Sequence, residues 1–249
     1  MKRIMLTVAY DGTNYHGWQR QPNGETIESV LNRCLSELLQ EETEVIGASR
    51  TDSGVHALCN VAVFDTNTNI PPDKLAYALN ARLPADIKIQ GSKEVDTAFH
   101  PRHCDSRKTY EYRIYHAEFP MPTERLYAHF SYTHYDVERM KEAARYFVGT
   151  HDFKSFCSTD SQAENTVRQM ERAEVEKNGN LIVFRVAGRG FLYNMVRIMA
   201  GTLMEVGRGN LEPEDVKRIL EAKNRSAAGP TAPACGLTLM KYEFLNTNI

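Results

Sequence analysis

The chain has 249 residues, of which 42% are hydrophobic and 25% are charged, and its formal net charge is −2. This composition is ordinary for a globular protein with one large domain or two smaller ones. No run approaches the roughly 18–20 apolar residues that a membrane helix needs, and the apolar run that follows the basic start is too short for a signal peptide. Membrane-spanning and secreted classes are therefore not expected.

The first half of the chain alternates strand and helix patterns. Apolar residues recur at helical spacing between Ile27 and Leu39, and Pro71-Pro72 opens a second helix. In chain order we expect a strand at 3–10, a polar and aromatic loop at 11–22, the first helix, strands near 43–49 and 58–66, a helix at 71–83 and a strand at 87–95. This β-α-β-β-α-β order predicts a ferredoxin-like α+β unit.

The second half repeats the pattern. Asn178-Gly179-Asn180 is typical of a hairpin turn, and Asp136 is placed to cap a helix. We expect a strand at 105–116, a helix at 136–148, hairpin strands at 166–177 and 181–187, helices at 190–206 and 212–223, and a closing strand at 237–244. The chain is predicted to form two similar α+β halves, residues 1–102 and 103–249.

Cysteine and histidine spacing argues against a metal site. The five cysteines are odd in number, far apart and without a Cys-x-x-Cys pair, which disfavours a zinc site or a disulfide framework. His100 and His103 lie three apart, but Pro101 intervenes and no acid or cysteine is well placed beside them. Since reduced thiols are typical of a reducing compartment, we expect a cytoplasmic protein without a metal.

Charge is distributed unevenly along the chain. Residues 181–209 contain four arginines, including Arg189, and one glutamate, and a second basic segment spans 102–113. Residues 37–44 are acidic by contrast. This pattern predicts a basic face that binds phosphates on a nearly neutral protein. Each run alone could equally be a solvated face.

The stretch Gly47-Ala48-Ser49-Arg50-Thr51-Asp52-Ser53-Gly54-Val55-His56-Ala57 concentrates reactive side chains between two apolar runs. Ser53-Gly54 indicates a tight turn, so Asp52 is predicted to lie on a loop between two strands, where functional side chains are often found. On local pattern alone, Asp52 could simply cap this turn. Arg50 could be its surface partner, and His56 could be an ordinary strand histidine.

This stretch resembles the signature loop of the tRNA pseudouridine synthase A family. Further similarity lies in Tyr10 to Pro22, in Arg107 to Tyr112, in Phe191 to Arg197, and in Gly229 to Pro233 followed by Gly236-Leu237. The resemblance covers nearly the whole chain and is weakest over residues 117–165. It implies that the two halves share a central mixed or antiparallel sheet in the pseudouridine synthase fold.

The resemblance also assigns residue roles. Asp52 corresponds to the catalytic nucleophile, Arg197 to the arginine that pairs with it, and Tyr110 to the tyrosine that lies against the target base. An adjacent guanidinium would keep the Asp52 pKa low, and an aromatic ring offers a pyrimidine a stacking surface. Without the resemblance, Arg50 is an alternative partner for Asp52, Tyr110 could be a core aromatic, and 190–206 could be a plain core helix.

Six further residues are predicted to bind substrate. The early loop supplies three that are expected to contact RNA, although Trp18 could instead anchor the loop to the core. The predicted set is Trp18, Arg20, Gln21, Arg50, His56 and Arg189.

The implied reaction isomerises uridine to pseudouridine at positions 38, 39 and 40 of the tRNA anticodon arm. It detaches uracil from C1′, rotates it and reattaches it through C5, a sequence that needs no cofactor. The resemblance further implies a homodimer that binds tRNA across both subunits. The residues leave two alternatives open: a non-catalytic RNA-binding module, and a hydrolase of glycosidic bonds. The hydrolase would need a second carboxylate, either Asp11 or Asp65.

Overall fold

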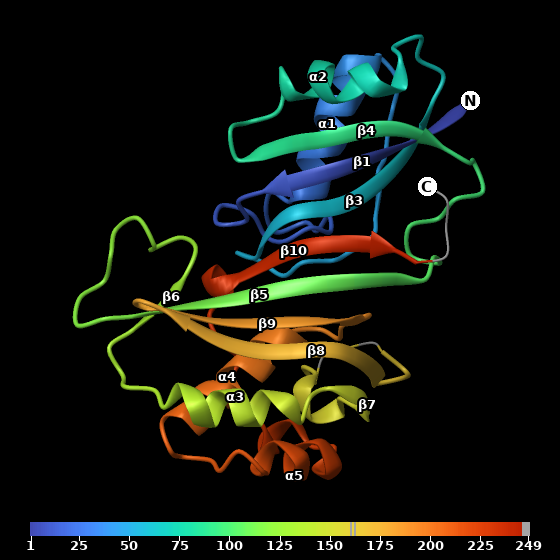
Figure 1. Cartoon of the computed structure of the whole chain (residues 1–249). Coiled ribbons are helices and arrows are strands. Elements are labelled where there is room, and N and C mark those ends of the chain that lie inside the picture. Colours follow the sequence, from blue (N-terminus) through green and yellow to red (C-terminus); the bar gives the residue numbers. More distant parts are fainter. Residues whose placement is uncertain (160, 162, 246–249) are drawn as a thin grey trace. The chain divides into compact units, whose positions relative to one another are not determined.

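The computed structural model describes residues 1–159, 161 and 163–245. It divides into two compact units, the first made of Met1–Ser106 with the residues from Leu239 on, and the second of Arg107–Thr238. Each unit combines β-strands, most of them paired antiparallel, with helices (Figure 1). The predicted α+β class is confirmed. Within the described part of the chain, no helix is long and apolar enough to cross a membrane.

The first unit follows the predicted β-α-β-β-α-β order. Its elements are β1 (Lys2–Tyr10), α1 (Ile27–Leu39), β2 (Ile46–Gly47), β3 (His56–Thr66), α2 (Leu75–Asn80), preceded by a 3₁₀ turn at Pro72–Lys74, and β4 (Ile87–Val95). Strand β1 lies between β4 and β3 and is antiparallel to both. Strand β2 pairs with β3, and β10 (Leu237–Phe244) also lies beside β3.

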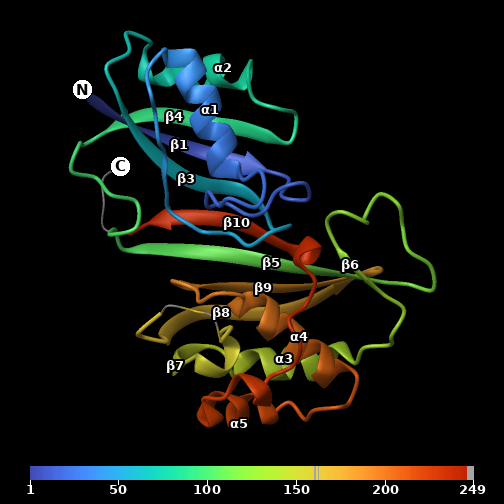
Figure 2. The same ribbon diagram turned by 180° about the vertical axis from the view of Figure 1, so that it is seen from behind.

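Helices α1 and α2 cover one face of this sheet, as the front and back views show (Figures 1 and 2). Strand β1 buries Ile4, Leu6 and Val8 at alternate positions, which is the spacing of one sheet face. The helical face of α1 is buried as predicted, through Ile27, Val30, Leu31, Cys34 and Leu35. A smaller core around Met5, Ala48, Val61 and Val63 includes residues on both sides of the Asp52 loop.

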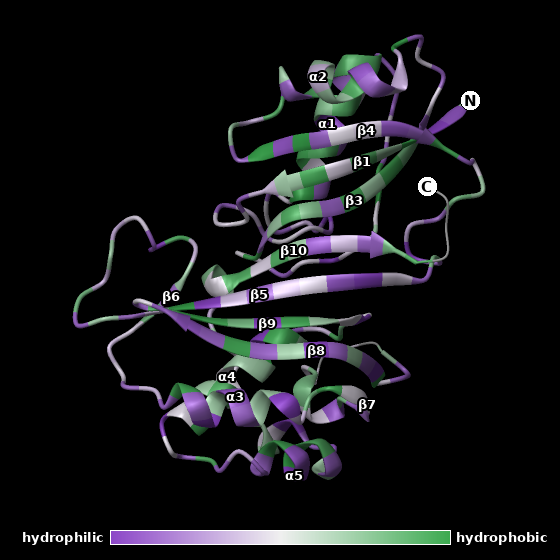
Figure 3. Cartoon of the chain, viewed as in Figure 1, coloured by the Kyte–Doolittle hydropathy of each residue, from purple (hydrophilic) through white to green (hydrophobic). Residues whose placement is uncertain are grey.

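The second unit contains β5 (Ser106–His116), β6 (His129–Ser131), α3 (Val137–Arg145), β7 (Gly149–Asp152), β8 (Val167–Asn178), β9 (Leu181–Arg189), α4 (Met195–Gly207) and α5 (Asp215–Ala222). Its strands run in the order β5-β9-β8-β7, with β6 beside β5. The side chain of Asp136 caps α3 as predicted, accepting from the N–H groups of Glu138 and Arg139. Much of β8 is hydrophilic, because one of its faces is exposed (Figure 3).

Helices α2, α3 and α5 are shorter than predicted, and two further elements differ for reasons that the structure shows. Strand β2 has two residues instead of about seven, because Val45 N–H bonds the Asn32 side chain at 2.9 Å rather than a strand. Helix α4 begins at Met195 rather than near Gly190, since Gly190 and Asn194 have φ angles of +74° and +59°. Left-handed residues cannot continue a right-handed helix. The short strands β6 and β7 were not predicted.

Candidate active site

Asp52 lies on the loop between β2 and β3, where its side chain is half-buried. Its carbonyl oxygen accepts a hydrogen bond from Val55 N–H at 3.1 Å. Gly54 lies inside this turn with φ +76°, a conformation that glycine adopts without a steric cost. The tight turn predicted at Ser53-Gly54 is therefore confirmed, and it holds Asp52 at the start of the turn.

The early loop, residues 11–22, packs directly on the Asp52 loop. Trp18 N–H donates to Thr51 O at 3.0 Å, and Tyr15 O accepts from Gly54 N–H at 3.3 Å and from the Ser53 hydroxyl at 3.2 Å. These bonds fix the backbone on both sides of Asp52. Because they join segments about 35 residues apart in sequence, they link two of the motifs that define the resemblance.

Two glycines make this close approach of the loops possible. A Cβ atom on Gly12 would overlap the carbonyl oxygen of Val55, and one on Gly17 would lie 2.7 Å from Thr51 O. Gly17 also has φ +84°. Since neither separation leaves room for a side chain, the glycines of the Tyr10 to Pro22 motif serve to seat one loop against the other.

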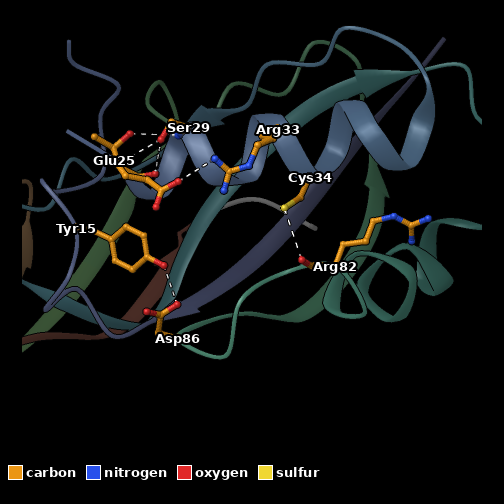
Figure 4. Close-up of polar contacts among 8 residues, drawn as sticks. Tyr15, Glu25, Ser29, Arg33, Cys34, Arg82 and Asp86 are labelled. Carbon is orange, nitrogen blue, oxygen red and sulfur yellow. Dashed lines mark hydrogen bonds and ion pairs between the residues drawn. The ribbon is translucent and has the colours of Figure 1, made fainter. Parts of the chain in front are cut away.

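The early loop is also tied to the start of β4 (Figure 4). The Tyr15 hydroxyl donates to Asp86 Oδ1 at 2.7 Å, and Asp11 N–H donates to Asp86 O at 2.9 Å. Burial, followed by this contact with Asp86, raises the pKa of Tyr15, so the hydroxyl remains a donor at neutral pH. The same view shows Arg33 bridging to Glu25, which precedes α1, at 2.8 Å.

Two of the residues predicted to bind substrate are buried in this unit. Trp18 is 0% exposed and packs against Tyr10 and Gly47. His56 is 3% exposed, and its Nδ1 lies 3.0 Å from Gly12 N and 3.1 Å from Asp11 Oδ1. Trp18 is therefore not placed to contact RNA directly, and it has the alternative role of anchoring the loop to the core. His56 supports the same loop through its contacts with Gly12 and Asp11.

Three predicted residues remain exposed beside this loop pair: Arg20, Gln21 and Arg50. Arg20 is 3.7 Å from Glu44, with both side chains well exposed, and such a pair contributes little. Arg102, which sequence analysis placed only in a basic segment, donates from Nε to Gly47 O at 2.7 Å. Burial and the positive charge of Arg50 both lower the pKa of Arg102, with Glu28 opposing them.

In the second unit, Tyr110 is a buried residue of β5, in register with Val186 of β9. Its ring packs edge-to-face on Phe191, with centroids 4.9 Å apart. Phe191 belongs to the loop that connects β9 to α4, so this contact brings two of the recognised motifs together within one unit.

Arg197 lies in the first turn of α4, where its guanidinium is held by two other segments. Nε donates to Ala232 O at 2.8 Å, and one terminal nitrogen donates to Asn194 Oδ1 at 2.8 Å. Asn194 in turn donates to the Ser158 hydroxyl at 2.8 Å. Ala232 N–H closes the arrangement by donating to Arg197 O at 3.1 Å. The guanidinium plane is therefore fixed from two sides.

Arg189 and its basic neighbours are paired with glutamates, which compensate part of their charge. Glu171 lies 3.2 Å from both Arg107 and Arg189. Burial opposes ionisation of Glu171, but hydrogen bonds from these two arginines outweigh it and lower the Glu171 pKa. Arg185 and Arg208 are also ion-paired, with Glu111 and Glu205 respectively. The basic face predicted from residues 181–209 is thus weaker than the sequence count suggests.

The first unit therefore gathers Asp52, Arg50 and the early loop, while the second carries Tyr110, Arg189 and Arg197 on β5, β9 and α4. Among residues 1–159, 161 and 163–245, no three His, Cys, Asp or Glu side chains are grouped so as to hold a metal ion. A family model described as tRNA pseudouridine synthase matches residues 6–104 and 143–244. The chain belongs to the tRNA pseudouridine synthase family.

Relatives in this family are similar over their full length. Proteins named tRNA pseudouridine synthase A are 48% identical in Thermoanaerobacter sp. (strain X514), over 97% of this chain and 99% of the relative, and 47% identical in Acetivibrio thermocellus, over 98% and 100%. A solved structure titled "Crystal Structure of a Cbf5-Nop10-Gar1 Complex" aligns with 81% of this chain and 45% of that chain, at 18% identity and a TM-score of 0.35.

As a member of the tRNA pseudouridine synthase family, the chain is an isomerase. Both carboxylates that a glycosidic-bond hydrolase was expected to use beside Asp52 are engaged by other side chains. Asp65 is held by two hydrogen bonds from Arg3, at 2.8 and 2.7 Å, and these bonds lower its pKa, which makes it a poor general acid. Asp11 is engaged by His56 and by Thr13.

Proposed function

We propose that this chain converts uridines 38, 39 and 40 of the tRNA anticodon arm into pseudouridine, with Asp52 as the nucleophile. The observation that carries the proposal is the placement of Asp52. It is a half-buried carboxylate on a turn whose neighbours, Thr51, Ser53 and Gly54, are all bonded to the early loop. A carboxylate that only capped a turn would not require a second loop built around it.

The chemistry needs a nucleophile that can hold one fragment while the other turns. The Asp52 carboxylate attacks either C1′ of the ribose or C6 of the uracil, and the bond between C1′ and N1 breaks. Uracil then rotates, C5 bonds to C1′, the bond to Asp52 is released, and the hydrogen on C5 leaves as a proton while N1 takes one up. Substrate and product have the same composition, so the reaction consumes no co-substrate.

The remaining side chains have supporting roles in this proposal. Tyr110 stacks on the target base, and Arg197 is the arginine that the family resemblance pairs with the nucleophile. The RNA backbone is contacted by three exposed residues, Arg20, Gln21 and Arg50. Arg189 also contacts it, because Glu171 is shared with Arg107 and compensates only part of the positive charge. The exposed early-loop residues support this assignment, because they flank the loop that carries Asp52.

A tritium-release assay tests the nucleophile. With tRNA that carries tritium at uridine C5, the wild type is expected to release tritium to water, and Asp52→Asn and Asp52→Ala are expected to release none above background. Both variants should bind tRNA at least as tightly as the wild type, since an anion has been removed from an RNA-binding surface. Asp73→Asn, which removes an exposed carboxylate paired with Lys74, controls for the change in charge. Substantial release by Asp52→Asn would refute the assignment.

The positions of modification and the assembly are tested separately. Transcripts that keep uridine at only one of positions 38, 39 and 40 should each release tritium, and a transcript with cytidine at all three should release none. We further propose that the protein is a cytoplasmic homodimer. Four exposed large apolar side chains support this, Phe119, Met121, Tyr127 and Tyr132, because they gather in one segment. Light scattering should give twice the monomer mass.

A further inference from the structure

The amide side chain of Asn60 lies beneath the Asp52 loop and is 0% exposed. Its Oδ1 accepts hydrogen bonds from Ser49 N–H at 3.3 Å and from Val61 N–H at 2.9 Å. Its Nδ2 donates to Ser49 O at 3.0 Å and to the Tyr10 hydroxyl at 3.3 Å. Both acceptor sites and both N–H groups of the amide are used, so only one orientation of the side chain satisfies them.

Asn60 occupies the point at which the loop leaves the sheet. Strand β2 pairs with β3 through Ile46 with Val63 and Gly47 with Ala62, and Ala48 N–H still bonds Val61 O at 2.7 Å. The next pair in this register is Ser49 with Asn60. There the side-chain amide of Asn60 takes the place of a backbone peptide and bonds the backbone N–H and C=O of Ser49. The backbones of the two segments are thus separated at this pair by the length of one side chain.

A second arm of the same network reaches the residue beside Asp52. The Tyr10 hydroxyl lies 2.7 Å from Thr51 Oγ1 and is buried with it. Asn60 Nδ2 donates to the same Tyr10 oxygen, and either hydroxyl can be the donor in the contact between Tyr10 and Thr51. Asn60 therefore anchors the loop at Ser49 directly and at Thr51 through Tyr10, on the N-terminal side of Asp52.

We propose that Asn60 is a positioning residue for Asp52, acting through Ser49 and through Tyr10 and Thr51. This inference rests on the proposed role of Asp52 as the nucleophile. Attack on a specific atom requires the carboxylate to be held closely, and a displacement of about 1 Å can cost roughly 10²-fold in rate. Binding of tRNA depends on other side chains, so loss of Asn60 should affect turnover rather than affinity.

The test compares Asn60→Ala with a matched variant. Asn80 in α2 makes the same type of contact elsewhere in the unit: its Nδ2 donates to Ile89 O at 2.8 Å, and its Oδ1 accepts from Ile89 N–H at 2.7 Å. We expect Asn60→Ala to lower kcat roughly 10²-fold with KM for tRNA unchanged. Asn80→Ala should lower the melting temperature but leave kcat unchanged. Equal loss of kcat in both variants would overturn the proposal.

Tyr10→Phe keeps the ring and removes only the hydroxyl, so it tests the second arm even if Asn60→Ala does not fold. Its kcat should fall with KM unchanged. Wild-type kcat in either folded variant refutes the positioning role. Asp52→Asn separates the two proposals: if it is active, the nucleophile assignment fails, whereas an inactive Asp52→Asn beside a fully active Asn60→Ala defeats only the present inference.

Discussion

At the level of single residues, Arg197 holds two oxygen atoms that belong to different segments. Its Nε bonds Ala232 O and a terminal nitrogen bonds Asn194 Oδ1, each at 2.8 Å. The planar fork of a guanidinium can satisfy both acceptors and still present further N–H groups to a carboxylate. A lysine ammonium has the charge but not this fixed geometry.

Arg197→Lys is therefore expected to lower kcat by roughly 10²-fold while the melting temperature stays close to that of the wild type. Single-turnover tritium release and thermal unfolding measure the two effects. Arg185→Lys is the control, because Arg185 pairs with Glu111 on the strands of the same unit and has no assigned role in the reaction. Near wild-type turnover in Arg197→Lys would contradict the role proposed for Arg197.

The ring and the hydroxyl of Tyr110 can be separated by substitution. The ring packs on Phe191, and stacking of a base on such a ring contributes about 1–3 kcal/mol. Tyr110→Phe should therefore bind modifiable tRNA more tightly than Tyr110→Ala, as measured by filter binding. If the two variants bind equally weakly, stacking is not the function of Tyr110. If Tyr110→Phe binds but does not turn over, the hydroxyl takes part in the chemistry.

At the level of elements, α4 and the segment 229–233 depend on each other. A Cβ on Gly201 would overlap the carbonyl oxygen of Pro230, and Gly229 N–H bonds the Thr202 hydroxyl at 3.0 Å. The segment thereby lies close enough to α4 for Ala232 O to reach Arg197. This packing gives a structural reason for the Gly229 to Pro233 motif, which by sequence was only a resemblance.

Gly201→Ala has two opposing effects: it raises the helix propensity of α4, and it adds a Cβ atom where segment 229–233 packs. Alanine favours a helix interior by about 1 kcal/mol over glycine, but a displaced segment would lose several contacts and the acceptor of Arg197. We expect the packing to dominate, so that Gly201→Ala lowers both the melting temperature and kcat. Gly91→Ala in β4 meets no atom within 4 Å and should leave both unchanged. A Gly201→Ala variant that is more stable and fully active would show that the segment can move freely.

The whole molecule has a net charge of −2. Its binding to a polyanion such as tRNA therefore requires positive charge that is concentrated locally. Many arginines of the second unit are paired with glutamates, whereas Arg20, Arg50 and Arg102 are exposed beside the Asp52 loop. We expect the logarithm of tRNA affinity to fall linearly with the logarithm of salt concentration. Arg50→Gln should reduce the slope by about 1, and Arg33→Gln, which removes a residue paired with Glu25, should not. Affinity that is independent of salt would contradict this prediction.

The sequence by itself determined what depends on neighbours along the chain. Helix α1 follows from apolar spacing, α3 from its Asp136 cap, and the turn after Asp52 from Ser53-Gly54, because each rests on contacts within a few residues. The class of fold and the family also follow from the sequence, since the order of elements and the stretch from Gly47 to Ala57 are read directly from it.

Only the tertiary structure decided which side chains are exposed and which charges are compensated. Trp18 is an aromatic residue in a polar loop, and its burial depends on Gly47, 29 positions away. In the sequence, Arg185 adds an uncompensated positive charge to the count. In the structure, β5 places Glu111 beside it, although the two residues are 74 positions apart in the chain. Asn60 reads as an ordinary strand residue until β2 places Ser49 opposite its side chain. Each of these pairs joins residues that are distant in sequence, so it forms only when the chain folds.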